Sequence, residues 1–174
     1  MSGVETARAL EPHIGGEIAA FQLARKPVDL SQIAYTDADG AATTIGENAG
    51  RVRLVNLWAT WCAPCRKEMP ALDRLQAELG GEAFAVLPIN IDTGDPGKPR
   101  AFLESIKIEN LPLNTDPGMA SFEAMKKRGL ALGLPVTALI DRQGCLIGHM
   151  NGPAEWDSDD AKALIEAAIA AAGA

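Results

Sequence analysis

Two stretches of mostly apolar residues, with a helical repeat between them, mark the centre of the chain. The stretches cover residues 52–58 and 83–92. Over residues 62–79 apolar side chains recur every three or four positions, and Gly80 follows, which predicts an amphipathic helix. Because a helix that joins two buried strands makes a crossover connection, we expect the two strands to lie parallel and adjacent in one sheet.

Shorter patterns predict the remaining elements. Residues 33–36 and 43–45, separated by Asp39-Gly40, are typical of a β-hairpin. We further predict helices over residues 99–106, 119–128 and 157–172, and strands over residues 135–141 and 145–150. Strands and helices that alternate in this way indicate the α/β class, with a central mixed sheet flanked by helices.

The first 30 residues carry a pattern of their own. Apolar side chains recur at helical spacing at Leu10, Ile14, Ile18 and Phe21. This spacing predicts an amphipathic helix over residues 4–24, although Gly15-Gly16 interrupts it. We therefore divide the chain into an N-terminal helical extension (residues 1–30) and a main domain (residues 31–174).

Composition narrows the class of protein. The chain has 174 residues, enough for a sizeable core, and a formal net charge of −7. An acidic chain without a basic block is a poor match to a phosphate backbone, so nucleic-acid binding is not expected. No run approaches the roughly 18 apolar residues that would cross a bilayer. Residues 1–20 contain no secretory signal, so we expect either a cytosolic protein or a targeting or anchor segment ahead of this sequence.

Two of the three cysteines, Cys62 and Cys65, stand where the buried strand gives way to the helix. A thiolate at a helix N-terminus faces unpaired backbone N–H groups and the positive end of the helix dipole, which lower its pKa. We therefore expect Cys62 to be the nucleophile and Cys65, one turn inside, to be the buried resolving thiol. Cys62 would attack a substrate disulfide, and Cys65 would release the reduced substrate and close a Cys62–Cys65 disulfide.

Other interpretations of these cysteines remain open. A structural zinc site needs four ligands, commonly with a second CxxC, and only Cys145, His13 and His149 are left to supply them. A purely structural disulfide is a second alternative. Cys145 itself is either a small buried side chain or the partner of a cysteine outside this sequence.

The run around the cysteines resembles a known family. Residues 58–70 read WATWCAPCRKEMP and are similar to the redox motif of the thioredoxin-like thiol–disulfide reductases of the TlpA/ResA/CcmG group. Residues 133–137 (GLPVT) resemble the cis-proline segment of that group, and the resemblance covers about residues 30–172. Residues 90–92 (NID) and 152–156 (GPAEW), together with the N-terminal helix, resemble the TlpA branch most closely.

The resemblance implies a fold and roles for individual residues. The fold would be thioredoxin-like, with a helix-containing segment inserted at about residues 93–117. Pro135 would form a cis peptide bond and face the cysteine pair, a minority state of the X–Pro bond that tertiary context maintains. The residues expected to contact substrate are Trp61, Ala63, Pro64 and Leu134. Trp61 would cover the disulfide, and Leu134 would tune the redox poise.

Two positions near the cysteines depart from thioredoxin itself. Asn56 stands where thioredoxin has a buried Asp that moves protons for the resolving cysteine, and an amide cannot act as a general base. Glu68, three residues after Cys65, should lie on the same side of the helix. Either Glu68 replaces the missing Asp as a catalytic proton donor or acceptor, as the resemblance to ResA-like members implies, or it is a solvated side chain favoured by the helix dipole.

The resemblance also implies a function. We expect a monomeric, periplasmic reductant of protein disulfides, anchored in the membrane by an N-terminal segment and supplied with electrons by a thiol transporter of the CcdA/DsbD type. Its substrates would be an apocytochrome c, a copper chaperone or an oxidase subunit whose cysteines must be reduced before metal insertion. The Cys62–Cys65 disulfide carries the electrons, so neither an organic cofactor nor a metal is expected. The alternatives are a copper chaperone that uses the same thiolates and a general cytosolic thioredoxin.

Overall fold

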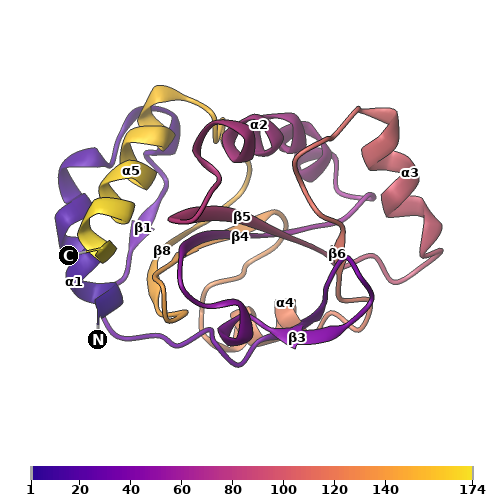
Figure 1. Cartoon of the computed structure of the whole chain (residues 1–174), viewed down its shortest axis with the longest axis horizontal. Coiled ribbons are helices and arrows are strands. Elements are labelled where there is room, and N and C mark those ends of the chain that lie inside the picture. Colours follow the sequence, from indigo (N-terminus) through magenta and orange to yellow (C-terminus); the bar gives the residue numbers. More distant parts are fainter. Residues whose placement is uncertain (1, 174) are drawn as a thin grey trace.

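The computed structural model describes residues 2–173 and folds them around one mixed sheet (Figure 1). The order of its eight strands is β1-β8-β7-β4-β5-β6-β2-β3. The strands are β1 (Gln22–Leu23), β2 (Ala34–Thr36), β3 (Ala42–Thr44), β4 (Val52–Trp58), β5 (Phe84–Asn90), β6 (Asn114–Thr115), β7 (Val136–Ile140) and β8 (Leu146–Asn151). The helices are α1 (Ser2–Leu10), α2 (Ala63–Leu79), α3 (Gly97–Ser105), α4 (Ala120–Lys127) and α5 (Asp159–Gly173). The predicted α/β class is confirmed.

The central strand β4 is buried along its whole length, which explains its nearly continuous apolar run. β5 lies parallel to it on one side and β7 antiparallel on the other. The crossover helix α2 joins β4 to β5. The parallel pair predicted from the two apolar stretches is therefore confirmed, and so is the β2–β3 hairpin.

Strand β4 sends alternate side chains into two separate cores. Leu54 and Trp58 belong to an apolar cluster that includes residues of α1, α2, α3 and α5. Val55 and Leu57 belong to a second cluster, which contains Met125 of α4. Figure 1 shows α2 and α4 on opposite sides of the central strands, with α1 and α5 together beside β1 and β8. Since both faces of the central strands are covered, a group carried by these strands can meet another protein only near the strand ends.

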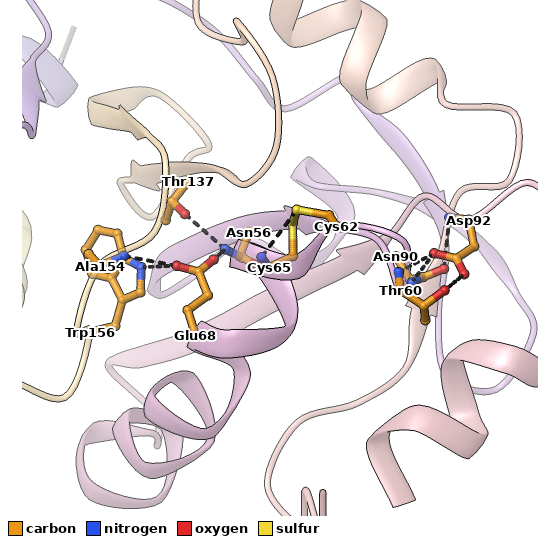
Figure 2. Close-up of a disulfide and its surroundings, with 10 residues drawn as sticks. All are labelled: Asn56, Thr60, Cys62, Cys65, Glu68, Asn90, Asp92, Thr137, Ala154 and Trp156. Carbon is orange, nitrogen blue, oxygen red and sulfur yellow. Dashed lines mark hydrogen bonds between the residues drawn. A yellow bond between two sulfur atoms is a disulfide. The ribbon is translucent and has the colours of Figure 1, made fainter. Parts of the chain in front are cut away.

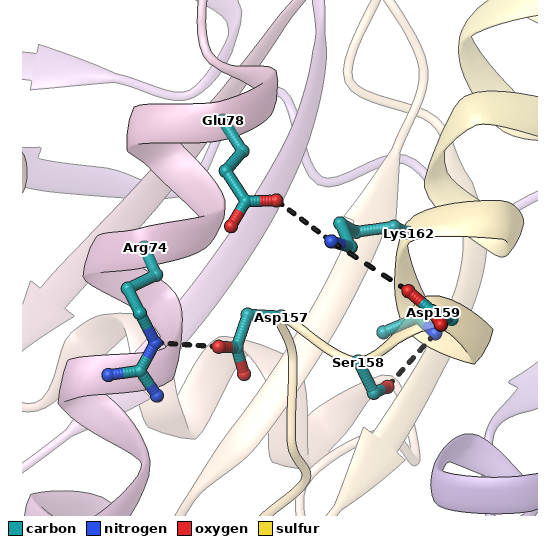
Figure 3. A network of polar contacts seen from close by, with 7 residues as sticks. Arg74, Glu78, Asp157, Ser158, Asp159 and Lys162 are labelled. Atoms are coloured by element: carbon teal, nitrogen blue, oxygen red, sulfur yellow. Dashed lines mark hydrogen bonds and ion pairs between the residues drawn. The ribbon is translucent and has the colours of Figure 1, made fainter.

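One ion pair connects α2 with the loop before α5, and a second connects α2 with α5 itself (Figure 3). Arg74 Nε lies 2.6 Å from Asp157 Oδ2, and Lys162 Nζ lies 2.8 Å from Glu78 Oε2. Exposed ion pairs contribute little to stability because water and salt screen them. The apolar cluster shared by α2 and α5 therefore supplies most of the energy that holds these helices together.

The helix predicted over residues 4–24 is wrong beyond Leu10, where α1 ends. A short 3-10 turn containing Pro12 follows. Gly16, with a φ of +53° that an α-helix does not accommodate, then begins a second 3-10 turn, Gly16–Ile18. The chain then forms β1, which pairs antiparallel with β8. Ile18 and Phe21 are nevertheless buried, so the spacing identified inward-facing side chains without identifying the backbone that carries them.

The other differences between the predicted and the observed elements are small. α3 starts at Gly97 rather than residue 99 and lies in the expected inserted segment. The two-residue strands β1 and β6 were too short for their pattern to be recognised. The domain boundary placed at residue 30 stays a prediction. Within residues 2–173, no helix combines the length and apolar character that a membrane-crossing span requires.

We expect the contact between Phe21 and β8 to be sensitive to the residue at position 148. A Cβ added to Gly148 would overlap the Phe21 ring and lie 2.7 Å from the carbonyl oxygen of Gln22. Gly148→Ala should therefore lower the free energy of unfolding by about 1–3 kcal/mol, measured by urea denaturation. Gly118→Ala is the control, because a Cβ there has no neighbour within 4 Å. Equal losses in the two variants would contradict this account.

Candidate active site

Cys62 and Cys65 form a disulfide at the junction of β4 and α2. Cys62 is the N-cap of α2, with extended backbone angles (φ −98°, ψ 104°). Its Sγ accepts a hydrogen bond of 3.2 Å from the backbone N–H of Cys65. The N–H of Cys62 in turn donates to the carbonyl of Ala59 at 3.2 Å. The first helical turn thus directs an N–H group that has no intrahelical partner at the Cys62 sulfur.

The two cysteines differ in their access to solvent. Cys62 exposes 6% of its surface and Cys65 exposes none. The neighbouring Ala63 and Pro64 are exposed, and Trp61 exposes 62% of its surface. A disulfide carried by another protein can therefore reach Cys62 but not Cys65, which fits the order of attack expected from the sequence.

The Leu134–Pro135 peptide bond is cis, as predicted. β7 starts directly after it, and Val136 pairs with Leu57 near the carboxyl end of β4. Pro135 therefore lies at the same edge of the sheet as the loop that carries Cys62. Pro135 is buried and Leu134 is half-buried.

Glu68 is buried, with 3% of its surface exposed, so the interpretation as a solvated side chain is wrong. Its Oε1 accepts a hydrogen bond of 2.7 Å from the Asn56 amide. Its Oε2 accepts bonds of 3.2 Å each from the backbone N–H of Ala154 and the indole N–H of Trp156. Figure 2 shows this network on the Cys65 side of the disulfide.

Asn56 connects three elements through one amide group. Its Nδ2 donates to Glu68 of α2 and, at 3.0 Å, to the hydroxyl of Thr137 in β7. Its Oδ1 is buried and accepts no hydrogen bond from the residues described. Asn56 cannot take up a proton, so Glu68 is the titratable group of this network.

Two opposing effects set the pKa of Glu68. Burial disfavours the charged form and outweighs the opposing effect, so the net pKa is raised from 4.5 to about 7. The hydrogen bonds from Asn56, Ala154 and Trp156 favour the carboxylate and act in the opposite direction. Because burial is the larger effect, Glu68 exchanges its proton near neutral pH.

A second polar cluster holds the loop that leads to Cys62, on the other side of the disulfide (Figure 2). The Asp92 carboxylate accepts hydrogen bonds from the backbone N–H of Thr60 at 2.7 Å and from the Thr60 hydroxyl. Asn90 also donates to Asp92, at 3.1 Å. Sequence reasoning assigned no role to Asp92, although two polar residues at the end of an apolar strand were a usable signal.

The remaining candidate ligands lie apart from the cysteine pair. Cys145 is a free, buried thiol whose pKa is raised mainly by burial. His149 is half-buried, which lowers its pKa, and His13 is exposed. Nowhere in residues 2–173 do three or more His, Cys, Asp or Glu side chains gather in a metal-binding arrangement. The pairing of Cys145 with a cysteine outside this sequence stays a prediction.

The sheet has a CxxC disulfide at the start of the helix after β4 and a cis-proline at the head of the antiparallel strand β7, both at the same edge. This arrangement places the protein in the thioredoxin-like class. The chain matches the family model described as Redoxin over residues 17–165 and belongs to that family. It is 32% identical over 127 residues to the thiol:disulfide interchange protein HelX of Rhodobacter capsulatus, covering 71% of this chain and 61% of HelX. It is 28% identical over 117 residues to the thiol-disulfide oxidoreductase ResA of Bacillus thuringiensis subsp. konkukian, covering 67% of this chain and 64% of ResA.

A solved structure supports the same fold. The protein described as the thiol:disulfide interchange protein DsbE from Chlorobium tepidum superimposes with a TM-score of 0.69 and 26% identity, covering 83% of this chain and 97% of that chain. The resemblance to the TlpA/ResA/CcmG group is therefore confirmed, whereas the closer likeness to the TlpA branch stays a prediction. The chain spans less than two thirds of the length of HelX and of ResA.

We expect Glu68→Gln to remove a pH dependence of stability. The pKa of Glu68 is near 4.5 in the unfolded chain and about 7 in the folded protein. Between these two pH values the folded protein therefore keeps a proton that the unfolded chain has released. Its contribution to stability therefore falls as the pH rises from about 4.5 to about 7, by about 3 kcal/mol in total. Urea denaturation of the oxidised protein at pH 5 and pH 8 should show that the variant lacks this fall.

Gln cannot make all the hydrogen bonds of Glu68, so the variant is less stable at both pH values. The informative quantity is the change in the free energy of unfolding between pH 5 and pH 8, compared between the variant and the wild-type protein. Glu78→Gln, on the exposed side of the same helix, is the matched control and should leave the pH dependence unchanged. A Glu68→Gln effect of equal size at pH 5 and pH 8 would show that Glu68 does not titrate in this range.

Proposed function

We propose that the protein is a thiol–disulfide oxidoreductase that reduces disulfides in other proteins. The observation that carries this proposal is the difference between the two sulfurs at the start of α2. Cys62 is the reachable one and receives an N–H hydrogen bond, while Cys65 is sealed behind it. The names of HelX, ResA and the DsbE protein describe the same kind of chemistry in relatives.

The reaction follows from these positions. In the reduced protein the Cys62 thiolate attacks one sulfur of a substrate disulfide, and the other sulfur leaves with the electron pair and takes up a proton. Cys65 then loses its proton and attacks the Cys62 sulfur, which expels the second substrate thiolate. The substrate gains two electrons and two protons, and the protein is left with the Cys62–Cys65 disulfide. A thiol donor must reduce this disulfide before the next turn.

Glu68 is the group we propose as acceptor of the Cys65 proton. It lies on the Cys65 side of the disulfide and, with a pKa of about 7, is partly ionised at neutral pH (Figure 2). A base whose pKa is close to the working pH transfers protons efficiently in both directions. The Asn56 amide keeps the carboxylate in place without competing for the proton.

The cellular setting is proposed on the resemblance to the TlpA/ResA/CcmG group. We place the protein outside the cytoplasmic membrane, with electrons supplied by a membrane thiol transporter of the CcdA/DsbD type. Its substrates would be the cysteines of an apocytochrome c, or the copper-site cysteines of a chaperone or oxidase subunit. The substrate-facing residues would be Trp61, Ala63, Pro64 and Leu134.

A trapping experiment tests the roles of the two cysteines. Reduced Cys65→Ser protein incubated with insulin should accumulate a mixed disulfide with an insulin chain, because no second thiol is available to resolve it. Non-reducing gels and intact mass would show the complex. Cys62→Ser is the matched control and should form little of it, since Cys65 has no exposed surface. Equal trapping by both variants would reject the assignment of Cys62 as nucleophile.

The redox potential tests the proposed direction of the reaction. We expect a value nearer to that of thioredoxin, about −270 mV, than to that of the oxidant DsbA, about −120 mV. Equilibration with defined ratios of reduced and oxidised glutathione, followed by thiol alkylation and mass determination, measures it. A potential above about −180 mV, the level of protein disulfide isomerase, would make the protein an isomerase or oxidant rather than a reductant.

A further inference from the structure

The large hydrophobic side chains that stand exposed among residues 2–173 are Trp61 and Leu132, with 62% and 88% of their surfaces accessible. Trp61 immediately precedes Cys62, and Leu132 lies three residues before Pro135. Both therefore belong to the sheet edge at which β4 ends and β7 begins. Isolated exposed apolar residues are common on proteins, but here both lie at the edge that carries the disulfide.

The loop that carries Leu132 is held in place by a side chain of β8. Asn151 Oδ1 accepts the backbone N–H of Leu132 at 2.9 Å, and Asn151 Nδ2 donates to the carbonyl of Leu130 at 2.8 Å. Asn151 itself is fixed in the sheet, where it pairs with Val136. Since Leu130 and Ala131 are buried, Leu132 is the projecting residue of a segment that is anchored on both sides.

A side chain presented in this way is suited to binding. Its backbone is already ordered, so a partner that covers Leu132 loses less conformational entropy than one that binds a mobile loop. The exposed side chain makes no contribution to the apolar core, so the fold itself does not require leucine here. Next to it, none of the hydrogen bonds among the described residues uses the backbone of Gly133 or Leu134, which leaves these groups free to pair with an extended segment.

We propose that Leu132 is a specificity-determining contact that binds an apolar side chain close to the reacting cysteine of a polypeptide substrate, and that Asn151 positions it. This inference rests on the proposed thiol–disulfide activity. The occupant is the polypeptide segment that flanks the substrate cysteine, because only 6% of Cys62 is exposed. A sulfur that reaches Cys62 must bring its own chain to this edge of the sheet, where Leu132 also lies exposed.

The test uses two synthetic peptides, each with one cysteine held as a mixed disulfide with 5-thio-2-nitrobenzoate. One peptide has Leu two residues before and two residues after the cysteine, and the other has Ser at both places. The Cys62 thiolate attacks the peptide sulfur, the S–S bond breaks, and 5-thio-2-nitrobenzoate leaves with the electron pair as a coloured thiolate. Cys65 then displaces the peptide as its thiol and closes the protein disulfide.

The ratio of the two second-order rate constants measures the preference for an apolar neighbour. The wild-type protein should favour the Leu peptide by roughly fivefold, the factor that about 1 kcal/mol of apolar burial supplies. Leu132→Ser should bring the ratio close to one, and the matched control Leu132→Met should keep it. Asn151→Ala should lower the ratio although Leu132 is still present.

Ellman's reagent is a small disulfide that carries no flanking peptide, so its reaction rate separates this inference from the proposed function. All variants should react with it within about twofold of the wild-type rate, because no residue changed here touches the sulfurs. A wild-type ratio near one, or a preference that survives Leu132→Ser, overturns the inference while the activity stands. Failure of the reduced wild-type protein to react through Cys62 with Ellman's reagent and both peptides overturns the proposed function, and the inference with it.

Discussion

A sulfur atom held at the first turn of α2 is the feature on which the rest of the structure depends. β4 is buried along its whole length, and so are the two residues after it, so the chain first reaches the surface at Trp61, next to Cys62. The helix that starts there supplies backbone N–H groups without intrahelical partners, one of which donates to the Cys62 sulfur. The same helix carries Cys65 one turn further in, beneath the surface. The geometry of a single strand-to-helix junction thus leaves the sulfur of Cys62 accessible and buries the sulfur of Cys65.

Three loops meet at this edge of the sheet, and each is held by a polar side chain from another part of the chain. Asp92 binds the backbone of Thr60, Asn151 binds Leu132, and Glu68 binds Ala154. Loop backbones have no ladder or helix in which to place their N–H groups, so a side-chain acceptor satisfies them instead. Because the acceptors project from β8 and α2 or from directly after β5, the positions of the loops are set by the rigid part of the fold, as a preorganised site requires.

Sequence patterns predicted the parts of this protein whose causes are local. The apolar runs of β4 and β5, the repeat along α2 and the placement of Cys62 at the helix start all follow from residues within one or two elements. The cis bond before Pro135 came from the family resemblance rather than from periodicity. The helix predicted over residues 4–24 failed because Gly16 and the pairing of β1 with β8 override the apolar spacing. The surroundings of Glu68 were also hidden, since Trp156 is 88 residues away along the chain. Residue spacing within one helix cannot show such a contact.

The burial of Glu68 can be explained in two ways that are not in competition. Three N–H donors converge on its carboxylate, and a neutral amide at this position would turn its own donor group toward at least one of them. The hydrogen bonds that connect α2, β4 and the loop of residues 152–156 through this side chain therefore already favour an acid over an amide. The apolar cluster around it, however, raises the pKa to about 7, which a purely structural acceptor does not need and which lowers stability when the group is charged. A carboxylate that is costly to ionise and lies on the side of the buried thiol is what a proton acceptor for Cys65 requires. The hydrogen bonds fix its position, and the burial sets its proton affinity.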